Sequence, residues 1–397
     1  MPNGPGFPPA VRAGGTYLVD PAGRLSASFA AMAEVQGVCD ERFGAVREAL
    51  AASLDRDDMG ASAAVYLDGE PVVDLWGGFA DVKCTVPWER DTITCVWSTT
   101  KVMAALCALI LADRGDLDLA APVARYWPEF AAAGKEGVQV RHLLAHTAGL
   151  PAWDQPMTVG DLYDWPSATA RLAGQPPRWE PGALAGYHQI TQGFLVGEVV
   201  RRVTGRPLGV FFAEEVAGPL GADFHIGLPA EHDHRVAPVI APPSAPSASR
   251  SAGAPGALTP NPAIQPGVGN TAAWRRAGIP SVGGFGNARS VGAVQSVLAC
   301  GGTARGVRLL SEAGCRRATE VQFRGVDQVL GASMRYGMGY GIFGNYCGWG
   351  GWGGSLVMVD LNARLTVSYV MNQMLDQGTL VDDRAMEILV AASEGVG

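Results

Sequence analysis

The spacing of apolar residues changes along the chain, and each change predicts a different kind of element. Near the start, apolar residues recur at the spacing of one helix face, at positions Phe43, Val46, Leu50 and Leu54. Two short runs rich in β-branched and aromatic residues follow, on either side of Asp68-Gly69. Because an Asp-Gly pair between such runs is a strong hairpin signal, we expect two antiparallel strands there.

The middle third is predicted to be mainly helical. The longest apolar run, Val102 to Ala112, follows Ser98 and predicts a helix, but its 11 residues are too few to span a bilayer. A second helical pattern begins near Ile190 and should end at Gly205, because glycine often lies just past a helix end.

Strand patterns return in the last third, with a turn at residues 360–364 and a final helix from about Leu380 to Ser393. Strands near both ends with helices between them predict an α+β fold, in which one antiparallel sheet is flanked by helices and joined to a helical lobe. We expect an irregular leader at residues 1–37 and an α/β domain built from residues 38–130 and 280–397. Between these two segments, residues 131–279 should form a mainly helical domain with a Pro/Ala/Ser-rich surface loop at 240–267.

Composition and charge exclude several classes of protein. The 397 residues are 48% hydrophobic, with a formal charge of −8, a pI near 5.3 and no basic run, so we expect no nucleic-acid partner. The seven cysteines are scattered and never spaced C-x-x-C, which argues against a disulfide framework or a structural zinc site. The N-terminus lacks a basic start followed by an apolar stretch, so we expect no signal peptide, no membrane partner and a cytoplasmic protein. A homo-oligomer remains open.

Lysine is scarce, which makes its positions informative. Only Lys83, Lys101 and Lys135 are lysine among the 30 basic residues. Arginine stays protonated, whereas a desolvated lysine can become a neutral base. Lys101 follows Ser98 by three positions at the start of an apolar helix, so the two side chains share a face where the helix dipole and burial favour a neutral amine. The pair suits a nucleophile and its base; the alternative is a serine N-cap followed by a solvated lysine.

Two further segments join this pair in an ordered set. Ser98-Thr99-Thr100-Lys101 is followed by Tyr187, just before a helix, and then by Trp349-Gly350-Gly351, which should lead into a strand that includes Trp352. The set resembles the serine β-lactamase-fold hydrolases, specifically the class C β-lactamase-like esterases called family VIII carboxylesterases, which share the β-lactamase/DD-peptidase fold of penicillin-binding proteins. The resemblance spans about residue 40 to the C-terminus and includes HLLAHTAGLP, VTGRPLG and GGFGNARS at residues 142–151, 203–209 and 283–290.

The resemblance implies a role for each segment. Tyr187 acts with Lys101 as general acid and base, and the oxyanion of acyl transfer rests on the N–H groups of Ser98 and Trp352. The glycines around Trp352 suit this role on physical grounds, because a backbone without side chains can approach a bound acyl group closely. Ordinary strand packing with glycines at a bulge is the alternative.

Two departures from the family pattern bear on the substrate. β-Lactamases and DD-peptidases carry K-[ST]-G at the position of Trp349-Gly350-Gly351, so the cation that holds a β-lactam carboxylate is missing here, and their Y-x-N is Tyr187-His188-Gln189 in this chain. We therefore expect a serine carboxylesterase that hydrolyses esters of small to medium uncharged acyl chains through an acyl-enzyme on Ser98, with neither cofactor nor metal. The expected substrate-binding residues are Trp97, Gln189, Trp349, Gly350 and Gly351.

Other functions stay open at this level. An acyltransferase, a β-lactamase or D-amino-acid peptidase, and a catalytically idle ligand-binding protein would all fit the fold, whereas the absence of G-x-S-x-G argues against an α/β-hydrolase. His232-Asp233-His234 lacks further nearby ligands, and His142 and His146 lack an H-E-x-x-H pattern. We interpret the first group as solvated and the second pair as packing and capping residues rather than metal ligands.

Overall fold

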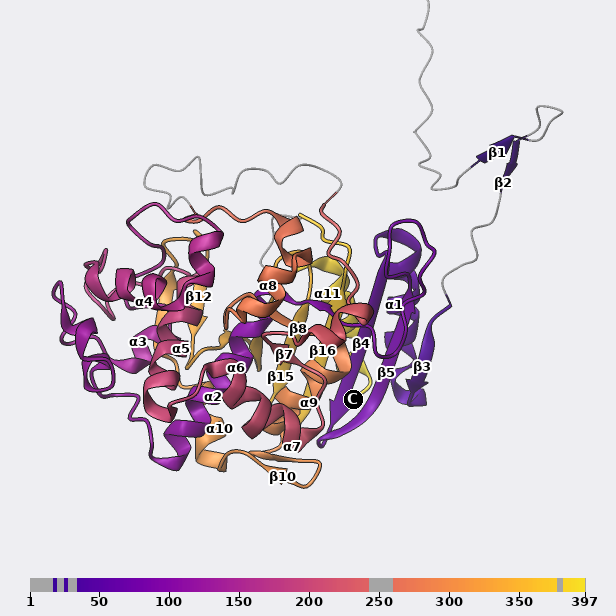
Figure 1. Ribbon diagram of the computed structural model, residues 1–397. Helices are drawn as coiled ribbons and strands as arrows, with labels where there is room; N and C mark the ends of the chain where they lie inside the picture. Colours follow the sequence, from indigo (N-terminus) through magenta and orange to yellow (C-terminus); the bar gives the residue numbers. More distant parts are fainter. Residues whose placement is uncertain (1–16, 20–24, 28–33, 243–259, 377–380, 397) are drawn as a thin grey trace, which may run out of the picture.

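The computed structural model describes residues 17–19, 25–27, 34–242, 260–376 and 381–396. At its centre lies a nine-stranded antiparallel sheet in the order β11-β12-β13-β14-β15-β16-β4-β5-β3 (Figure 1). Its strands come from the two ends of the described chain: β3 Gln36–Cys39, β4 Gly60–Leu67, β5 Glu70–Gly78, β11 Phe323–Val326, β12 Ser333–Tyr336, β13 Gly341–Phe343, β14 Tyr346–Gly350, β15 Leu356–Asp360 and β16 Leu365–Met371. The predicted α+β architecture is confirmed.

The two halves of the sheet meet at one strand pair. β16 lies beside β4 in a register that runs from Leu365 opposite Leu67 to Met371 opposite Ala61. β4 then turns into β5 through Asp68 and Gly69, whose φ angles of 53° and 85° suit the tight turn of a right-twisted hairpin. The predicted hairpin is confirmed.

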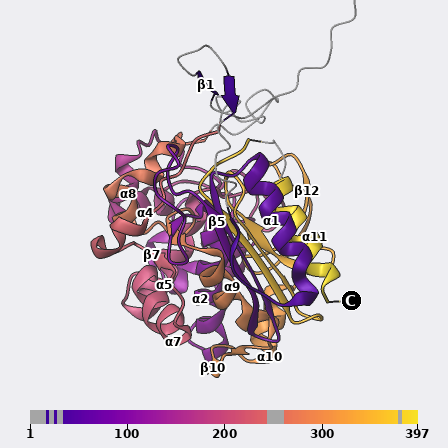
Figure 2. The same ribbon diagram turned by 90° about the vertical axis from the view of Figure 1, so that its right-hand side faces the viewer.

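Helices cover both faces of the sheet. α1 (Gly44–Arg56) and α11 (Asp383–Glu394) pack against each other and against β4 and β16 on one face (Figure 2). α9 (Ala288–Ala299) lies on the other face against β4, β15 and β16. Beyond α9 lies α2 (Thr100–Arg114), which contacts α5 (Thr191–Thr204). The sheet therefore forms the middle layer of a three-layer arrangement.

α2 is buried from Thr100 to Ala112, as expected for a helix that is apolar on all sides. It ends at Gly115, which adopts a φ of 84°, and α5 ends in the same way at Gly205, as predicted. The α-helical geometry begins at Thr100 rather than at Ser98. Ser98 lies one step earlier, in a 3₁₀ turn over Trp97–Thr99 that starts at a positive φ of 47° for Trp97.

Shorter elements complete the described chain. Three short strands form a separate sheet in the order β6-β8-β7, at Thr94–Cys95, Gly284–Gly286 and His225–Ile226. Two small hairpins are β1 Tyr17–Val19 with β2 Leu25–Ala27, and β9 Thr303–Ala304 with β10 Val307–Arg308. The remaining α-helices are α3 Val140–Leu144, α4 Trp165–Gly174, α6 Leu208–Phe212, α7 Gly218–Leu220, α8 Ala272–Ala277 and α10 Glu312–Ala318.

Several expected boundaries differ from the structure. Residues 1–37 are not entirely irregular, since β1 and β2 pair and β3 begins at Gln36. A short edge strand needs only backbone partners, so its sequence carries little signal. Of the expected loop 240–267, residues 243–259 lie outside the described residues, while Ile240 pairs with Gln373 and residues 266–270 form a 3₁₀ helix. The final helix starts at Asp383, and the expected start at residue 380 lies outside the described residues.

In the described part of the chain, every helix is too short or too polar to cross a lipid bilayer.

Candidate active site

Ser98 and Lys101 meet at the start of α2. The Lys101 Nζ lies 3.1 Å from the Ser98 Oγ, and both residues are buried, with exposed fractions of 2% for Lys101 and 9% for Ser98. Because Ser98 sits in the first helical turn, its backbone N–H has no acceptor within the helix. The structure therefore brings a hydroxyl, an amine and a free amide to one place.

The surroundings of Lys101 favour its neutral form. Its Nζ lies 2.7 Å from the Gln189 carbonyl oxygen and 3.0 Å from that of Ser281, and no carboxylate pairs with it among the described residues. Burial holds the pKa of Lys101 well below its usual value. A neutral amine has two N–H donors and one lone pair. With the donors directed to the two carbonyls, the lone pair faces the Ser98 hydroxyl.

Tyr187 completes the group. Its ring centre lies 4.8 Å from the Lys101 Nζ, and its hydroxyl lies within hydrogen-bonding reach of Ser98. The same hydroxyl accepts a hydrogen bond from the Trp349 Nε1, at 2.9 Å. Burial raises the pKa of Tyr187 above its usual value, and these two hydrogen bonds oppose that shift only in part. Tyr187 is therefore a neutral phenol that can pass a proton on.

The Trp-Gly-Gly segment lies directly against the nucleophile turn. A Cβ added to Gly351 would lie 2.2 Å from the Val96 carbonyl oxygen and 2.2 Å from the Ser355 Oγ, so only glycine fits. Ser355 fixes the approach, because its Oγ contacts the Thr99 Oγ1 at 2.9 Å and donates to the Val96 carbonyl at 2.8 Å. The segment does not lead straight into a strand as expected. β14 ends at Gly350, and a turn precedes β15.

Trp352 lies within that turn. Its backbone N–H makes no hydrogen bond to any other described residue, and its indole meets the Trp97 indole edge to face, with ring centres 5.2 Å apart. The expected second oxyanion donor is thus an unpaired amide on a turn beside the nucleophile, rather than on a strand.

The β-lactamase family model matches residues 46–391 of the chain. The chain belongs to the β-lactamase family. Members of this family with esterase names are among its relatives, and the family identifies the chain as a serine hydrolase.

Three relatives in this family illustrate the similarity. The esterase/beta-lactamase LipL of Mycobacterium tuberculosis (strain ATCC 25618 / H37Rv) is 36% identical over 377 residues, covering 88% of this chain and 85% of that protein. A crystal structure of a family VIII carboxylesterase is 42% identical with a TM-score of 0.85, and a penicillin-binding protein homologue from Caulobacter crescentus is 37% identical with a TM-score of 0.83. Both structures cover 91% of this chain and are themselves covered completely. The resemblance seen in the sequence is confirmed.

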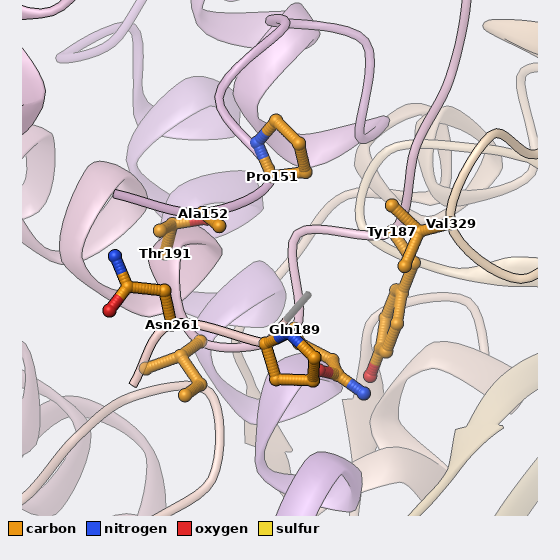
Figure 3. Close-up of a pocket in the computed structure, with 9 residues that line it drawn as sticks. Pro151, Ala152, Tyr187, Gln189, Thr191, Asn261 and Val329 are labelled. Atoms are coloured by element: carbon orange, nitrogen blue, oxygen red, sulfur yellow. The ribbon is translucent and has the colours of Figure 1, made fainter. Parts of the chain in front are cut away.

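A small pocket opens beside Tyr187 in this β-lactamase-family chain, with a volume of about 320 Å³ including its open mouth (Figure 3). The Gln189 amide extends toward the Tyr187 hydroxyl there and is an exposed polar group without a hydrogen-bond partner among the described residues. The pocket is lined by Pro151, Ala152, Tyr187, Gln189, Ile190, Thr191, Pro260, Asn261 and Val329.

The other residues expected to bind substrate do not line this pocket. Trp97 is 2% exposed and packs between Trp274 and Trp352. The Trp349 indole is also buried and holds the Tyr187 hydroxyl, while Gly350 and Gly351 carry the backbone past the nucleophile turn. Their part in substrate binding stays a prediction.

Two further residues support Tyr187. Asp327 was not singled out by the sequence, whereas His146 was expected to be a packing residue. The buried Asp327 carboxylate accepts hydrogen bonds from the Tyr187 backbone N–H at 3.0 Å and from the Tyr336 hydroxyl at 2.8 Å. His146, at a φ of 61°, meets the Tyr187 ring edge to face with ring centres 5.0 Å apart, and its Nδ1 accepts a hydrogen bond from the His188 backbone N–H. An Asp followed closely by a turn is a weak local signal for Asp327.

The histidines behave as packing and capping residues. The His142 ring caps α3 together with Gln139, and His146 packs behind Tyr187, which confirms that interpretation. His232-Asp233-His234 lies in a 3₁₀ helix, where Asp233 pairs with Arg275 and Arg276. No group of three potential metal ligands occurs among the residues that the structure describes.

Proposed function

We propose that the chain is a carboxylesterase that hydrolyses esters of small to medium uncharged acyl chains through an acyl-enzyme on Ser98. One observation carries the proposal. Lys101 is buried with no carboxylate partner among the described residues, and the lone pair of its neutral amine faces the Ser98 hydroxyl, with the Tyr187 phenol beside both. This arrangement supplies a nucleophile, a base and a proton donor for acyl transfer.

The reaction proceeds in two halves. The Ser98 Oγ attacks the ester carbonyl carbon while the Lys101 Nζ takes the hydroxyl proton, and the resulting oxyanion accepts hydrogen bonds from the Ser98 and Trp352 amides. The tetrahedral intermediate collapses, and the leaving alkoxide takes a proton from Tyr187, which regains it from Lys101. Water then attacks the acyl-enzyme carbonyl and gives a proton to the same pair. The second tetrahedral intermediate collapses, and the pair returns that proton to the departing Ser98 Oγ, which releases the carboxylic acid and restores the hydroxyl.

The surroundings of Trp349 support an uncharged acyl group. At this position the chain offers an indole whose only N–H is used by the Tyr187 hydroxyl. No cation is therefore available there to hold a substrate carboxylate. The Gln189 amide in the adjoining pocket can serve a neutral polar group near the scissile bond.

A panel of p-nitrophenyl esters tests the proposal. The acetate, butyrate and octanoate should show turnover that peaks at short or medium chain length, and Ser98→Ala should lower kcat by about 10³-fold or more. A matched ester whose acyl chain ends in a carboxylate should be a poorer substrate than the butyrate.

Cephalosporin turnover provides the contrasting measurement. The esterase assignment fails if the wild type cleaves a chromogenic cephalosporin with higher kcat/KM than p-nitrophenyl butyrate, or if neither is cleaved faster than by Ser98→Ala. Added alcohol that diverts the acyl group into a new ester would instead identify an acyltransferase.

A further inference from the structure

We propose that Arg384, whose guanidinium donates to the Gly353 carbonyl, is a positioning residue that orients the Trp352 amide toward the oxyanion. The inference rests on the proposed function, because it assigns the Trp352 N–H the role of oxyanion donor. Arg384 lies near the N-terminus of α11, and its side chain has no exposed surface.

All five N–H groups of the Arg384 guanidinium have acceptors. The Nε–H and one N–H of Nη2 donate to the two carboxylate oxygens of Asp382, at 2.9 and 2.8 Å. The Nη1 donates to the Asp58 carboxylate at 2.6 Å and to the Gln373 carbonyl at 3.0 Å. The second Nη2 donor reaches the Gly353 carbonyl oxygen at 2.7 Å. The two buried carboxylates hold the planar guanidinium in one orientation, so the Gly353 carbonyl that it contacts is fixed as well.

The fixed carbonyl belongs to the same turn as Trp352. The Gly354 N–H donates to the Gly351 carbonyl at 3.1 Å, which closes the turn around Trp352 and Gly353. In a trans peptide the C=O and the following N–H point in opposite directions. The Gly351 carbonyl therefore sets the direction of the Trp352 N–H, and Gly354 sets the direction of that carbonyl.

Glycines allow Arg384 to approach this closely. Gly353 and Gly354 adopt φ angles of 90° and 137°, where side chains are strained. A Cβ on Gly354 would lie 2.6 Å from the Arg384 Nη2 and 2.9 Å from the Asp382 carboxylate. The turn and the guanidinium thus lie in close contact, which the missing side chain at Gly354 allows.

The main variant is Arg384→Lys, which keeps the charge beside the two carboxylates but cannot form the five-donor fork. We expect kcat for p-nitrophenyl butyrate to fall by about 10- to 100-fold with KM changed less than about threefold, since displacing one oxyanion donor acts on the transition state. Tyr369→Phe is the matched control. It removes a hydrogen bond to Asp58 in the same buried cluster without touching the turn.

A thionoester provides a readout that a loss of stability would not change. Sulfur accepts hydrogen bonds poorly, so an intact oxyanion site prefers the ordinary ester over the thionoester of the same acid. Arg384→Lys should reduce this preference about tenfold, and Tyr369→Phe should leave it at the wild-type value even if both variants unfold at a lower temperature.

Equal preferences in Arg384→Lys and wild type would overturn the proposal. If Arg384→Lys does not fold, Gly354→Ala approaches the same contact from the turn, and an unchanged preference in that variant has the same meaning. A wild type that cleaves neither ester contradicts the esterase function itself. A wild type that cleaves both equally contradicts only the role of the Trp352 amide and, with it, of Arg384.

Discussion

Two buried lysines in this chain show how local acceptors set the state of the same side chain. Lys135 directs its Nζ at three carbonyl oxygens, those of Ala132, Ala173 and Gln175, near the C-terminal end of α4. Three acceptors and the negative end of a helix suit the three donors of an ammonium group. Lys101 has two carbonyls and a hydroxyl at the start of a helix, which suits a neutral amine. We therefore expect Lys101 to act as a base and Lys135 to be a structural residue.

Replacing Lys101 with arginine should abolish its function as a base. Arginine stays protonated, so Lys101→Arg should lower kcat/KM for p-nitrophenyl butyrate by about 10³-fold or more. In the wild type, kcat/KM should rise with pH as the Lys101 ammonium loses its proton. It should not fall again through ionisation of Tyr187 near pH 10, because burial raises the pKa of that phenol. Lys135→Arg, measured over the same pH range, should keep the wild-type profile.

The Trp349 indole should act through Tyr187 rather than through the substrate alone. Trp349→Phe removes the N–H that donates to the Tyr187 hydroxyl while keeping an apolar ring. We expect kcat to fall about tenfold, since a misplaced phenol delivers its proton less well. Trp165→Phe, which removes an indole hydrogen bond to Glu198 in the helical region, is the matched control and should leave kcat unchanged. A change confined to KM would show that the indole serves substrate binding instead.

At the scale of elements, the segment that follows β14 can lie against the turn that carries Ser98 only because residue 351 is a glycine without a Cβ. Gly351→Ala would force a methyl group to within 2.2 Å of the Val96 carbonyl oxygen. We expect a loss of about 1–3 kcal/mol in the free energy of unfolding and a loss of activity, because the turn must move away from Ser98. Gly137→Ala, where nothing lies within 4 Å of the added Cβ, should change neither quantity. Urea unfolding and esterase assays of the two variants give the comparison.

The elements that the sequence predicted best are those with a local signal. The Asp68-Gly69 hairpin, the apolar helix α2 and the end of α5 at Gly205 follow from spacing and turn chemistry. The turn at Trp352 was expected to be a strand because its glycines suit either geometry. What decides between them is the contact with Ser355 and Arg384, which no local pattern shows.

At the scale of the whole molecule, the site joins segments that are far apart in sequence. Ser98, Lys101 and Tyr187 could be grouped because they form a recognisable ordered set. Asp327 could not, because it supports Tyr187 across 140 positions. The two carbonyls that orient Lys101 belong to Gln189 and Ser281, and backbone groups have no sequence signature. Side-chain chemistry was therefore predictable, whereas the groups that set its protonation were not.

Keeping Lys101 neutral should leave a mark on the stability of the whole molecule. Its folded pKa lies below that of the unfolded chain, so between the two values the unfolded state binds one more proton. The free energy of unfolding should then rise with pH across this window, by up to about 1.4 kcal/mol per pH unit. Lys101→Met has no such group. Its stability also reflects the two carbonyls left without a donor, but that contribution does not depend on pH.

The informative quantity is therefore the difference between wild type and Lys101→Met as a function of pH. We expect this difference to shift in favour of the wild type as the pH rises from 7 to 9.5, measured by urea unfolding. Burial lowers the pKa of Lys135 as well, but its three carbonyl acceptors favour the charged form, so Lys135→Met should show a smaller slope. Parallel curves for wild type and Lys101→Met would mean that Lys101 is protonated in the folded protein, and a protonated amine cannot take the Ser98 proton.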